Sequence, residues 1–276
     1  MRDIARALLD VLDSGQRAAL ATVTRVSGSV PQQPGARLLL RSDGSLVGTV
    51  GGGAIEYTVL TALQRALEHG KTEVLSYDLT RDLGMCCGGR MELFVEAIEG
   101  VPKLWLFGAG HVAEATARLA KSVQFDVHVV DEREEWSTAA RFPDCHVINR
   151  DPEAVLSDTA FTERDWLLIA THDHALDERI LERCLTQPHR YIGLVGSKRK
   201  VLRLVRRISL KSGGNIASLQ RVYAPVGLDL GAVSPSEIAV SIVSELVALR
   251  HGRAAPHLRL ALTSLEQDEP ETQEIS

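Results

Sequence analysis

The stretch KLWLFGAGHVAEATARLAKSVQFDVHVVD, residues 103–131, decides the fold of this chain. An apolar run, Leu104 to Phe107, is followed by a glycine turn, a helical pattern and a second apolar run, Val127 to Val130. The order strand, turn, helix, strand predicts one βαβ unit of a parallel sheet. The turn has the form G-x-G-x-x-G/A, which is typical of folds that bind dinucleotides.

Each small residue of the turn has its own physical role. Gly108 permits the sharp turn, Gly110 lets the backbone approach a pyrophosphate, and Ala113 allows the helix and strand to pack closely. Phosphates would lie at the helix N-terminus, near His111, on free N–H groups. Asp131 follows about 20 residues later, where a carboxylate accepts a ribose hydroxyl and repels a 2′-phosphate, so an NAD-like dinucleotide is favoured over NADP. The alternative is a glycine turn kept only for packing.

The composition is that of an ordinary globular protein. The chain has 276 residues, which suits two domains, with 45% hydrophobic and 24% charged residues. A net charge of −5 argues against nucleic acid or an anionic membrane as a partner. No run reaches the ~20 apolar residues of a membrane span, and the N-terminal segment lacks the pattern of a signal peptide. The four cysteines do not resemble the framework of a small secreted domain, so we expect a cytoplasmic location.

Glycine and proline mark a boundary between two domains. The segment Glu99-Gly100-Val101-Pro102 has the composition of a linker. Helical and strand patterns before it predict a smaller α+β domain over residues 1–100. Strands and helices alternate after it, which predicts a Rossmann-like, doubly wound parallel sheet over residues 101–256. Residues 257–276 are acidic with little apolar content near the end, and we expect a disordered tail there.

Three consecutive glycines, Gly51, Gly52 and Gly53, stand between a predicted strand and the helix that follows it. Each glycine adds conformational entropy to the unfolded chain, so packing gives little reason for all three. A close approach of the backbone to an anion or ligand at the start of the helix explains them, with N–H groups forming the cradle. A simple irregular turn is the alternative.

Cys86 and Cys87 are adjacent on a second glycine-rich loop, ahead of Arg90. A disulfide between neighbouring cysteines is strained, and the loop has no C-x-x-C or histidine partner at zinc spacing. A thiolate here, stabilised by N–H groups and Arg90, would bind a soft metal or carry sulfur. The alternative is a pair of small residues, one of them buried, beside a glycine turn. Cys145 and Cys184 fall in apolar segments and are expected in the core.

A polar loop, THDHALD at residues 171–177, follows a predicted strand of the second domain. Loops of this kind lie at the edge of the sheet where doubly wound folds bind ligands. His172 and Asp173 lie in a His-x-His pattern with two acids, which would bind a metal or move protons. Alternatively, Asp177 caps the next helix and the histidines are solvated.

A second loop of this edge, GLVGSKRK at residues 193–200, passes from glycine into cations. Positive charge at the start of a helix opposes the helix dipole and calls for compensation. The segment around Ser197 and Lys198 therefore predicts a site for an anion or phosphate, against the alternative of an exposed basic helix start.

Taken together, these motifs give the chain a resemblance to the XdhC/CoxI family. The resemblance runs from about Ala21 to Gly252 and rests on six ordered motifs, at residues 48–56, 86–89, 108–111, 171–174, 191–200 and 227–239. Members of that family are maturation factors. They bind molybdenum cofactor, promote exchange of an oxo ligand for the terminal sulfido ligand with a cysteine desulfurase as partner, and deliver the cofactor into a xanthine dehydrogenase-type apoenzyme.

The resemblance implies the same work for this chain, as a cofactor chaperone more than a turnover enzyme. It implies that Cys87, together with Cys86, contacts the cofactor, with Cys87 as the molybdenum contact. The cofactor is molybdopterin, in some enzymes in a dinucleotide form, so glycine cradles and an anion loop suit it.

An NAD-dependent oxidoreductase with His172 or His174 as general acid or base is the alternative. An NAD-sensing regulator is a third reading, but the chain lacks a basic surface for DNA. We also expect a homodimer, because the small N-terminal sheet would leave edges to cover.

Overall fold

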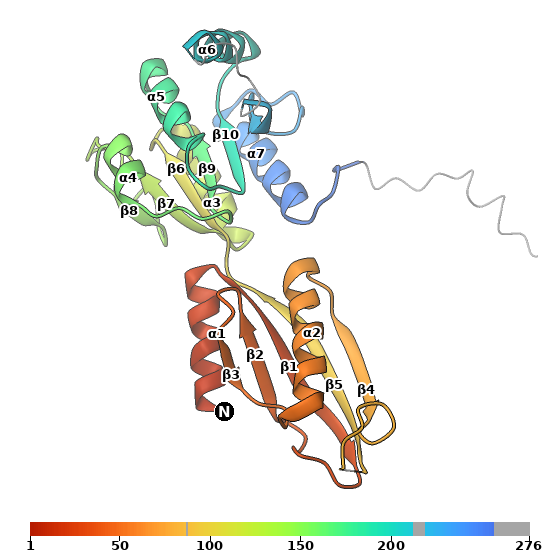
Figure 1. The fold of residues 1–276 in the computed structure, drawn as a ribbon. Helices are drawn as coiled ribbons and strands as arrows, with labels where there is room; N and C mark the ends of the chain where they lie inside the picture. The colour runs from red at the N-terminus through yellow and green to blue at the C-terminus, as the bar shows by residue number, and fades with distance from the viewer. Residues whose placement is uncertain (87, 212–218, 257–276) are drawn as a thin grey trace, which may run out of the picture.

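The computed structural model describes residues 1–86, 88–211 and 219–256, in two parts joined by a short linker after Glu99 (Figure 1). An antiparallel sheet of five strands with two helices forms the first part. A parallel sheet of six strands with helices on both faces forms the second. The predicted fold class, a Rossmann-like domain after a smaller α+β domain, is confirmed. None of the described helices combines the length and the apolar character that crossing a bilayer requires.

The first sheet lies between two helices. In spatial order its strands are β3 (Leu46–Gly48), β2 (Arg37–Arg41), β1 (Arg17–Ser27), β5 (Arg90–Glu99) and β4 (Glu73–Asp78), and its helices are α1 (Arg2–Ser14) and α2 (Gly53–His69). Successive side chains of a strand point to opposite faces. Ala19, Ala21 and Val23 of β1 therefore pack in the core under α2, while Ala18 and Leu20 pack in the core under α1.

The second sheet has the strand order of a doubly wound fold. Its strands are β11 (Val222–Tyr223), β10 (Tyr191–Leu194), β9 (Trp166–Ile169), β6 (Lys103–Phe107), β7 (Asp126–Val130) and β8 (His146–Ile148). Chain order reverses between β6 and β9, and ligands of such sheets bind beyond the carboxyl ends of the strands at that point.

Two layers of helices cover this sheet. One face carries α3 (His111–Ser122) and α7 (Pro235–Arg250); the other carries α4 (Pro152–Asp158), α5 (His174–Cys184) and α6 (Lys198–Lys211), and a short 3-10 helix, η1 (Leu219–Arg221), precedes β11. Strand β6 is buried on both faces, since Leu104 and Leu106 pack on the α3 side and Trp105 and Phe107 on the α5 side. A strand covered on both faces needs a continuous apolar run, which is what the sequence has there.

The two cysteines expected in the core differ in burial. Cys184 is fully buried in α5, as predicted. Cys145 stands just before β8 and is half-buried, because β8 begins only at His146 and is an edge strand of three residues.

Candidate functional site

The predicted site residues fall into two groups at opposite ends of the molecule (Figure 1). The first group, with Gly51 to Gly53 and Cys86, lies where β5 starts, away from the Rossmann domain. The second group follows the carboxyl ends of the parallel strands, on the far side of the Rossmann domain. The loop that carries Cys86 and Cys87, here called the cysteine loop, precedes β5. Strand β5 alone, which has ten residues, spans about 33 Å between this loop and the linker. One chain therefore does not bring the two groups together.

In the first group, the glycine loop and the cysteine loop both pack against the loop after β1. A Cβ at Gly51 would lie 2.5 Å from the Cγ of Pro31, and one at Gly89 would lie 2.4 Å from the carbonyl oxygen of Ser29. Gly51 and Gly89 are therefore glycines because the neighbouring loop leaves no room for a side chain. Gly52 and Gly53 have φ angles of 70° and 64°, and a Cβ on either would meet nothing within 4 Å. These two glycines are required by their left-handed backbone and leave open space beside the start of α2.

The cradle of the glycine loop already holds a carboxylate of the chain. Glu56, in the first turn of α2, accepts hydrogen bonds from the Thr49 hydroxyl, from the Val50 N–H at 3.3 Å and from the Gly52 N–H at 3.1 Å. The Thr49 hydroxyl lowers the pKa of Glu56, and the loop N–H groups add to this effect against the opposing effect of burial. The anion predicted for this cradle is thus an internal one. The sequence carries a signal for this role, because Glu56 lies in the first turn of the helix, where the helix dipole favours an acid.

Cys86 is exposed on a bend of the cysteine loop, while Cys87 lies outside the described residues. Backbone hydrogen bonds at 2.9 Å hold the loop, from the Leu79 N–H to Gly89 and from the Met85 N–H to Leu79. The Arg90 guanidinium pairs with Asp78 at 3.3 Å. Its charge is therefore directed at a carboxylate of β4, which weakens the expectation that Arg90 stabilises a thiolate.

In the second group, the glycine turn has the expected open shape. Gly108 has a φ angle of 114°, and a Cβ there would lie 2.3 Å from the carbonyl oxygen of Ala170 at the end of β9. At Gly110, the N-cap of α3, a Cβ would meet nothing within 4 Å, and no side chain caps this helix end. Ala113 is buried against the sheet. The first N–H groups of α3 are thus free of a side-chain cap and stand beside the open space at Gly110, as a phosphate site requires.

Asp131 is not the free acceptor that the sequence predicted. The carboxylate is 4% exposed and accepts hydrogen bonds from the Ala109 N–H at 2.8 Å and from the Arg133 guanidinium at 2.9 and 2.6 Å. Burial raises the pKa of Asp131, but the hydrogen bonds from Arg133 and from the N–H groups of Arg133 and Ala109 outweigh it and lower the pKa. A ribose hydroxyl would have to compete with Arg133. The expected repulsion of a 2′-phosphate also loses its basis, since the carboxylate is paired.

An aromatic and cationic cluster, which sequence reasoning missed, lies beside the glycine turn. The Trp136 ring has Arg133 at 5.1 Å and Arg141 at 4.7 Å from its centroid, and the exposed His111 meets its edge at 5.4 Å. Arg141 also donates to the Ala109 carbonyl at 2.9 Å. The turn is therefore held on both sides by guanidinium groups, one at its carbonyl and one through Asp131.

The loop at residues 171–177 is organised around a buried carboxylate. Asp173 caps α5 by accepting the Ala175 N–H at 3.0 Å, so the cap is this residue and not Asp177. The side chain of Asp177 is fully buried and accepts from the Thr171 hydroxyl at 2.7 Å. His172 and the neighbouring His174 are exposed. Within residues 1–86, 88–211 and 219–256 these two histidines belong to no group of three converging metal donors.

Lys200 and Lys198 of the predicted anion loop, residues 193–200, have different roles. Lys200 donates to Asp177 at 2.6 Å and to the Val195 carbonyl at 3.1 Å, so it compensates the buried carboxylate. Ser197 and Lys198 instead line a cavity of about 540 Å³ between this loop and residues 225–232. Lys198 is exposed, and its ammonium group is the one left to meet an anion in this cavity.

Relatives of the chain share most of its length. A protein of Escherichia coli (strain K12), YqeB, is 33% identical over 239 residues, which cover 84% of this chain and 43% of YqeB; the chain thus spans less than half of that relative. A protein of Bacillus subtilis (strain 168) that is named as a probable subunit of xanthine dehydrogenase is 26% identical over 87% of this chain and 95% of its own length. The molybdenum cofactor insertion chaperone PaoD of Escherichia coli (strain K12) is 23% identical over 90% of this chain and 88% of its own.

A solved structure shares the fold. The crystal structure of a xanthine dehydrogenase from Bacillus halodurans matches with a TM-score of 0.52 and 24% identity, over 91% of this chain and 96% of that one. Residues 11–78 match the XdhC and CoxI family, and residues 104–246, more than half of the chain, match the XdhC Rossmann domain. The chain therefore belongs to the XdhC and CoxI family.

Proposed function

We propose that this protein binds molybdenum cofactor, supports its sulfuration and inserts it into a xanthine dehydrogenase-type apoenzyme. The observation that carries the proposal is the exposed thiol of Cys86 in a member of the XdhC and CoxI family, on a loop that packs against the loop after β1, as the glycine loop with Gly52 and Gly53 does. Soft thiolate sulfur is a ligand that suits molybdenum better than a carboxylate does. The name of the relative PaoD, a molybdenum cofactor insertion chaperone, supports the insertion step.

The molybdenum end of the cofactor belongs, in this proposal, at the cysteine loop with Cys86 and Cys87. The room beside Gly52 and Gly53 would admit the pterin, since a Cβ on either residue would meet no atom within 4 Å. Molybdopterin is too short to reach from there to the carboxyl ends of the Rossmann strands, because β5 alone spans about 33 Å. The cavity with Ser197 and Lys198 would hold the phosphate of a second ligand, such as a free nucleotide.

A homodimer offers another way to join the two groups. Strands β3 and β4 are the open edges of the N-terminal sheet, and Val74 on β4 is 64% exposed. A homodimer in which the cysteine loop of one copy lies at the carboxyl ends of the Rossmann strands of the other would join the two groups. In that arrangement a dinucleotide form of the cofactor would use Cys87 of one copy and Lys198 of the other.

The alternative function is that of an NAD-dependent oxidoreductase. The uncapped start of α3 at Gly110 favours it, because N–H groups there would donate hydrogen bonds to a pyrophosphate. Against it, Asp131 is paired with Arg133, and His172 and His174 are exposed on a loop. A general acid or base acts best in a position held by neighbouring groups, and the exposed His174 has only a long contact of 3.8 Å with Asp177.

Cofactor binding is tested by incubating the purified protein with molybdenum cofactor and measuring bound molybdenum and pterin. We expect stoichiometric binding by the wild type, and a sharp loss in Cys86→Ala and Cys87→Ala. Cys145→Ala, the half-buried thiol beside β8, is the matched control and should bind as the wild type does. Absence of binding by the wild type, together with NADH-dependent turnover, would replace the proposal by the oxidoreductase.

The sulfuration step needs its own experiment. The protein is loaded with oxo-form cofactor, treated with a cysteine desulfurase and L-cysteine, and mixed with a xanthine dehydrogenase-type apoenzyme. Xanthine oxidation should appear with the wild-type protein and fail with Cys87→Ala when activity is expressed per molecule of cofactor that each protein binds. Equal activation by both proteins would remove the thiol from the sulfuration step and leave only insertion.

A further inference from the structure

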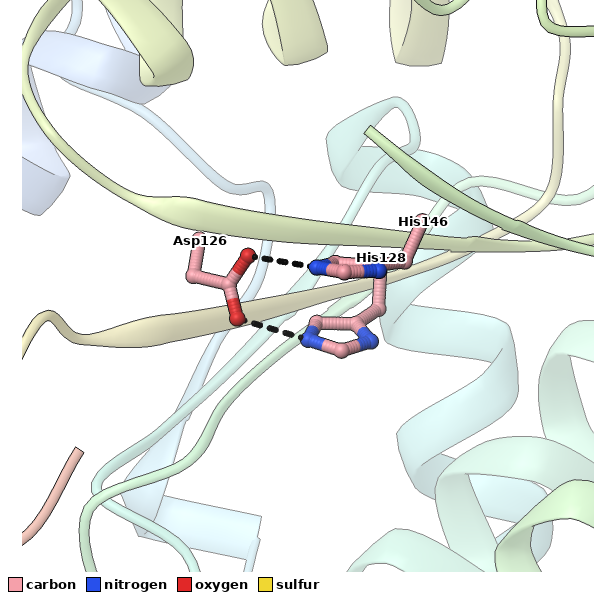
Figure 2. A group of neighbouring side chains, drawn as sticks. All are labelled: Asp126, His128 and His146. Carbon is pink, nitrogen blue, oxygen red and sulfur yellow. Dashed lines mark hydrogen bonds and ion pairs between the residues drawn. The ribbon is translucent and has the colours of Figure 1, made fainter. Parts of the chain in front are cut away.

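Three side chains of the kinds that ligate metal ions gather on β7 and β8 of the Rossmann sheet, away from the glycine turn that follows β6. They are Asp126 and His128 of β7 and His146 of β8, and Figure 2 shows both imidazoles facing one carboxylate. The Nε2 atom of His128 lies 3.0 Å from one oxygen of Asp126, and the Nε2 atom of His146 lies 3.1 Å from the other. One donor atom from each side chain falls within 4.8 Å of the other two.

The pairing of two strands produces this group. Asp126 and His128 are two residues apart on β7, so their side chains point to the same face of the sheet. His146 pairs directly with His128 across the parallel strands β7 and β8. The group is therefore set by backbone register and not by flexible loops. Asp126 and His146 are the first residues of β7 and β8, so the group lies away from the carboxyl ends of the strands, where ligands of this fold bind.

One of the two imidazoles is held rigidly. His128 stacks on the Trp105 ring with centroids 4.4 Å apart, and the Trp105 indole N–H donates to the buried Asp165 at 2.9 Å. The side chain of His128 is 15% exposed, and that of His146 is 63% exposed. A fixed ligand on one strand and an accessible one on the next leave the group open to an ion from solvent.

We propose that Asp126, His128 and His146 bind a divalent transition-metal ion of the zinc type. Two imidazole nitrogens and one carboxylate oxygen are a donor set that Zn²⁺ uses, with water at the remaining position. The two imidazole nitrogens lie 3.0 and 3.1 Å from the two different oxygens of Asp126, and one donor atom of each side chain lies within 4.8 Å of the other two, close to the ~3.3 Å that separates ligands of a tetrahedral ion with bonds of about 2.0–2.1 Å. Imidazole ligands exclude Mg²⁺ and Ca²⁺, which prefer oxygen.

Binding requires one small movement. The rings of His128 and His146 stack with centroids 4.5 Å apart and planes 19° apart. The lone pair of an imidazole nitrogen lies in the plane of its ring, so stacked rings do not aim at one point. His146 is the exposed ring, and a turn about its Cβ–Cγ bond brings its Nε2 toward the ion while His128 stays on Trp105. The ion would then tie the edge strand β8 to β7.

Two further groups act on the site. Lys121, at the end of α3, places a positive charge near Asp126 that opposes a cation without occupying a ligand position. Cys145, next to His146 in the chain, directs its thiol to the Pro143 carbonyl at 3.5 Å and stays outside the three converging donors. The ion therefore depends on the two histidines and the aspartate.

The test is calorimetric titration of the full chain with ZnCl2 after metal has been removed with EDTA. A Cys86→Ser, Cys87→Ser background removes the two thiols of the cysteine loop as competing ligands. We expect one zinc ion per chain, no binding of MgCl2, and a loss of affinity of at least about tenfold in His146→Ala and Asp126→Asn. His172→Ala, on the exposed loop before α5, is the matched control and should titrate as the parent does.

Zinc affinity that is unchanged in His146→Ala overturns the proposal, whatever His172→Ala does. Absorption of the Co²⁺ complex is a second measurement on the parent protein, since intense visible bands mark tetrahedral nitrogen and oxygen ligands. A parent protein that takes up neither Zn²⁺ nor Co²⁺ also refutes the site. The titration does not involve molybdenum cofactor, so its result stands apart from the proposed function.

Discussion

The carboxylate of Asp131 accepts a hydrogen bond from the backbone N–H of Ala109 at 2.8 Å, which ties the end of β7 to the glycine turn after β6. The same carboxylate is paired with Arg133 and almost fully buried. A residue that the sequence presents as a ligand for ribose therefore positions the turn itself. A nucleotide bound at the glycine turn would meet the N–H groups of α3 and the guanidinium groups around Trp136, and it would find no free carboxylate at Asp131.

Replacement of Asp131 should destabilise the fold. Asp131→Ala leaves the Ala109 N–H and the Arg133 guanidinium without their partner, and we expect a loss of about 2–4 kcal/mol in the free energy of unfolding. Asp131→Asn keeps the shape and one acceptor, so it should cost less. Glu132→Ala, at the exposed neighbour, is the control and should change little. Urea unfolding measures all three, and a loss in Asp131→Ala no larger than in the control would refute the structural role.

The stabilising effect of Asp131 should depend on pH in a defined direction. Its pKa is lowered in the folded protein, so its contribution is present above the unfolded value of about 3.9 and is lost as pH falls from there through the folded value. The difference in unfolding free energy between the wild type and Asp131→Asn should be constant from about pH 5 to pH 7 and shrink below about pH 4. Urea titrations across this range test it; a difference that grows toward low pH has the wrong sign.

Lys200 and Lys198, two residues apart on α6, should behave differently. Lys200→Met removes the partner of a fully buried carboxylate, Asp177, and should cost about 3 kcal/mol or more in unfolding free energy. Lys198→Met removes an exposed cation and should leave stability nearly unchanged while weakening binding of inorganic phosphate at the adjacent cavity. Thermal unfolding and phosphate titration of the two variants separate these roles. Equal stability of both variants would contradict the assignment of Lys200.

Glu56 should compete with external anions for the glycine loop. Glu56→Ala frees the N–H groups of Val50 and Gly52, so we expect tighter binding of molybdate or sulfate and a loss of about 1 kcal/mol in stability. Glu68→Ala on the same helix, with its exposed side chain, is the control. Anion titration followed by a shift in melting temperature is the measurement. Unchanged anion binding in Glu56→Ala would show that these N–H groups are not an anion cradle.

Among the three described cysteines, Cys86 should react first with iodoacetamide. It is exposed, whereas burial raises the pKa of the Cys145 thiol and raises that of the fully buried Cys184 further. Thiolate is the reactive form, so modification should follow the order Cys86, Cys145, Cys184. Tandem mass spectrometry of timed samples locates the label and distinguishes Cys86 from Cys87. Labelling of Cys145 ahead of Cys86 would place the cysteine loop in a more buried setting than the structure does.

Local patterns predict most of the elements because each depends on neighbouring residues. The glycine turn at Gly108 and the apolar runs on either side of it fix one βαβ unit, and the cap at Ser234 with Pro235 starts α7 where the pattern predicts. The pairing of side chains was not predicted, even between residues that lie close together in the chain. Glu56 fills the cradle of the glycine loop, and Arg133 occupies Asp131.

The sequence by itself determined the class of fold, the family and the loops that carry polar and thiol groups. Only the tertiary structure decided which of these groups meet. Strand β5 separates Cys86 from Lys198, and the register of β7 with β8 brings His128 beside His146. The physical reason is that hydrophobic periodicity depends on local spacing alone, whereas strand direction and register depend on which distant apolar faces pack together.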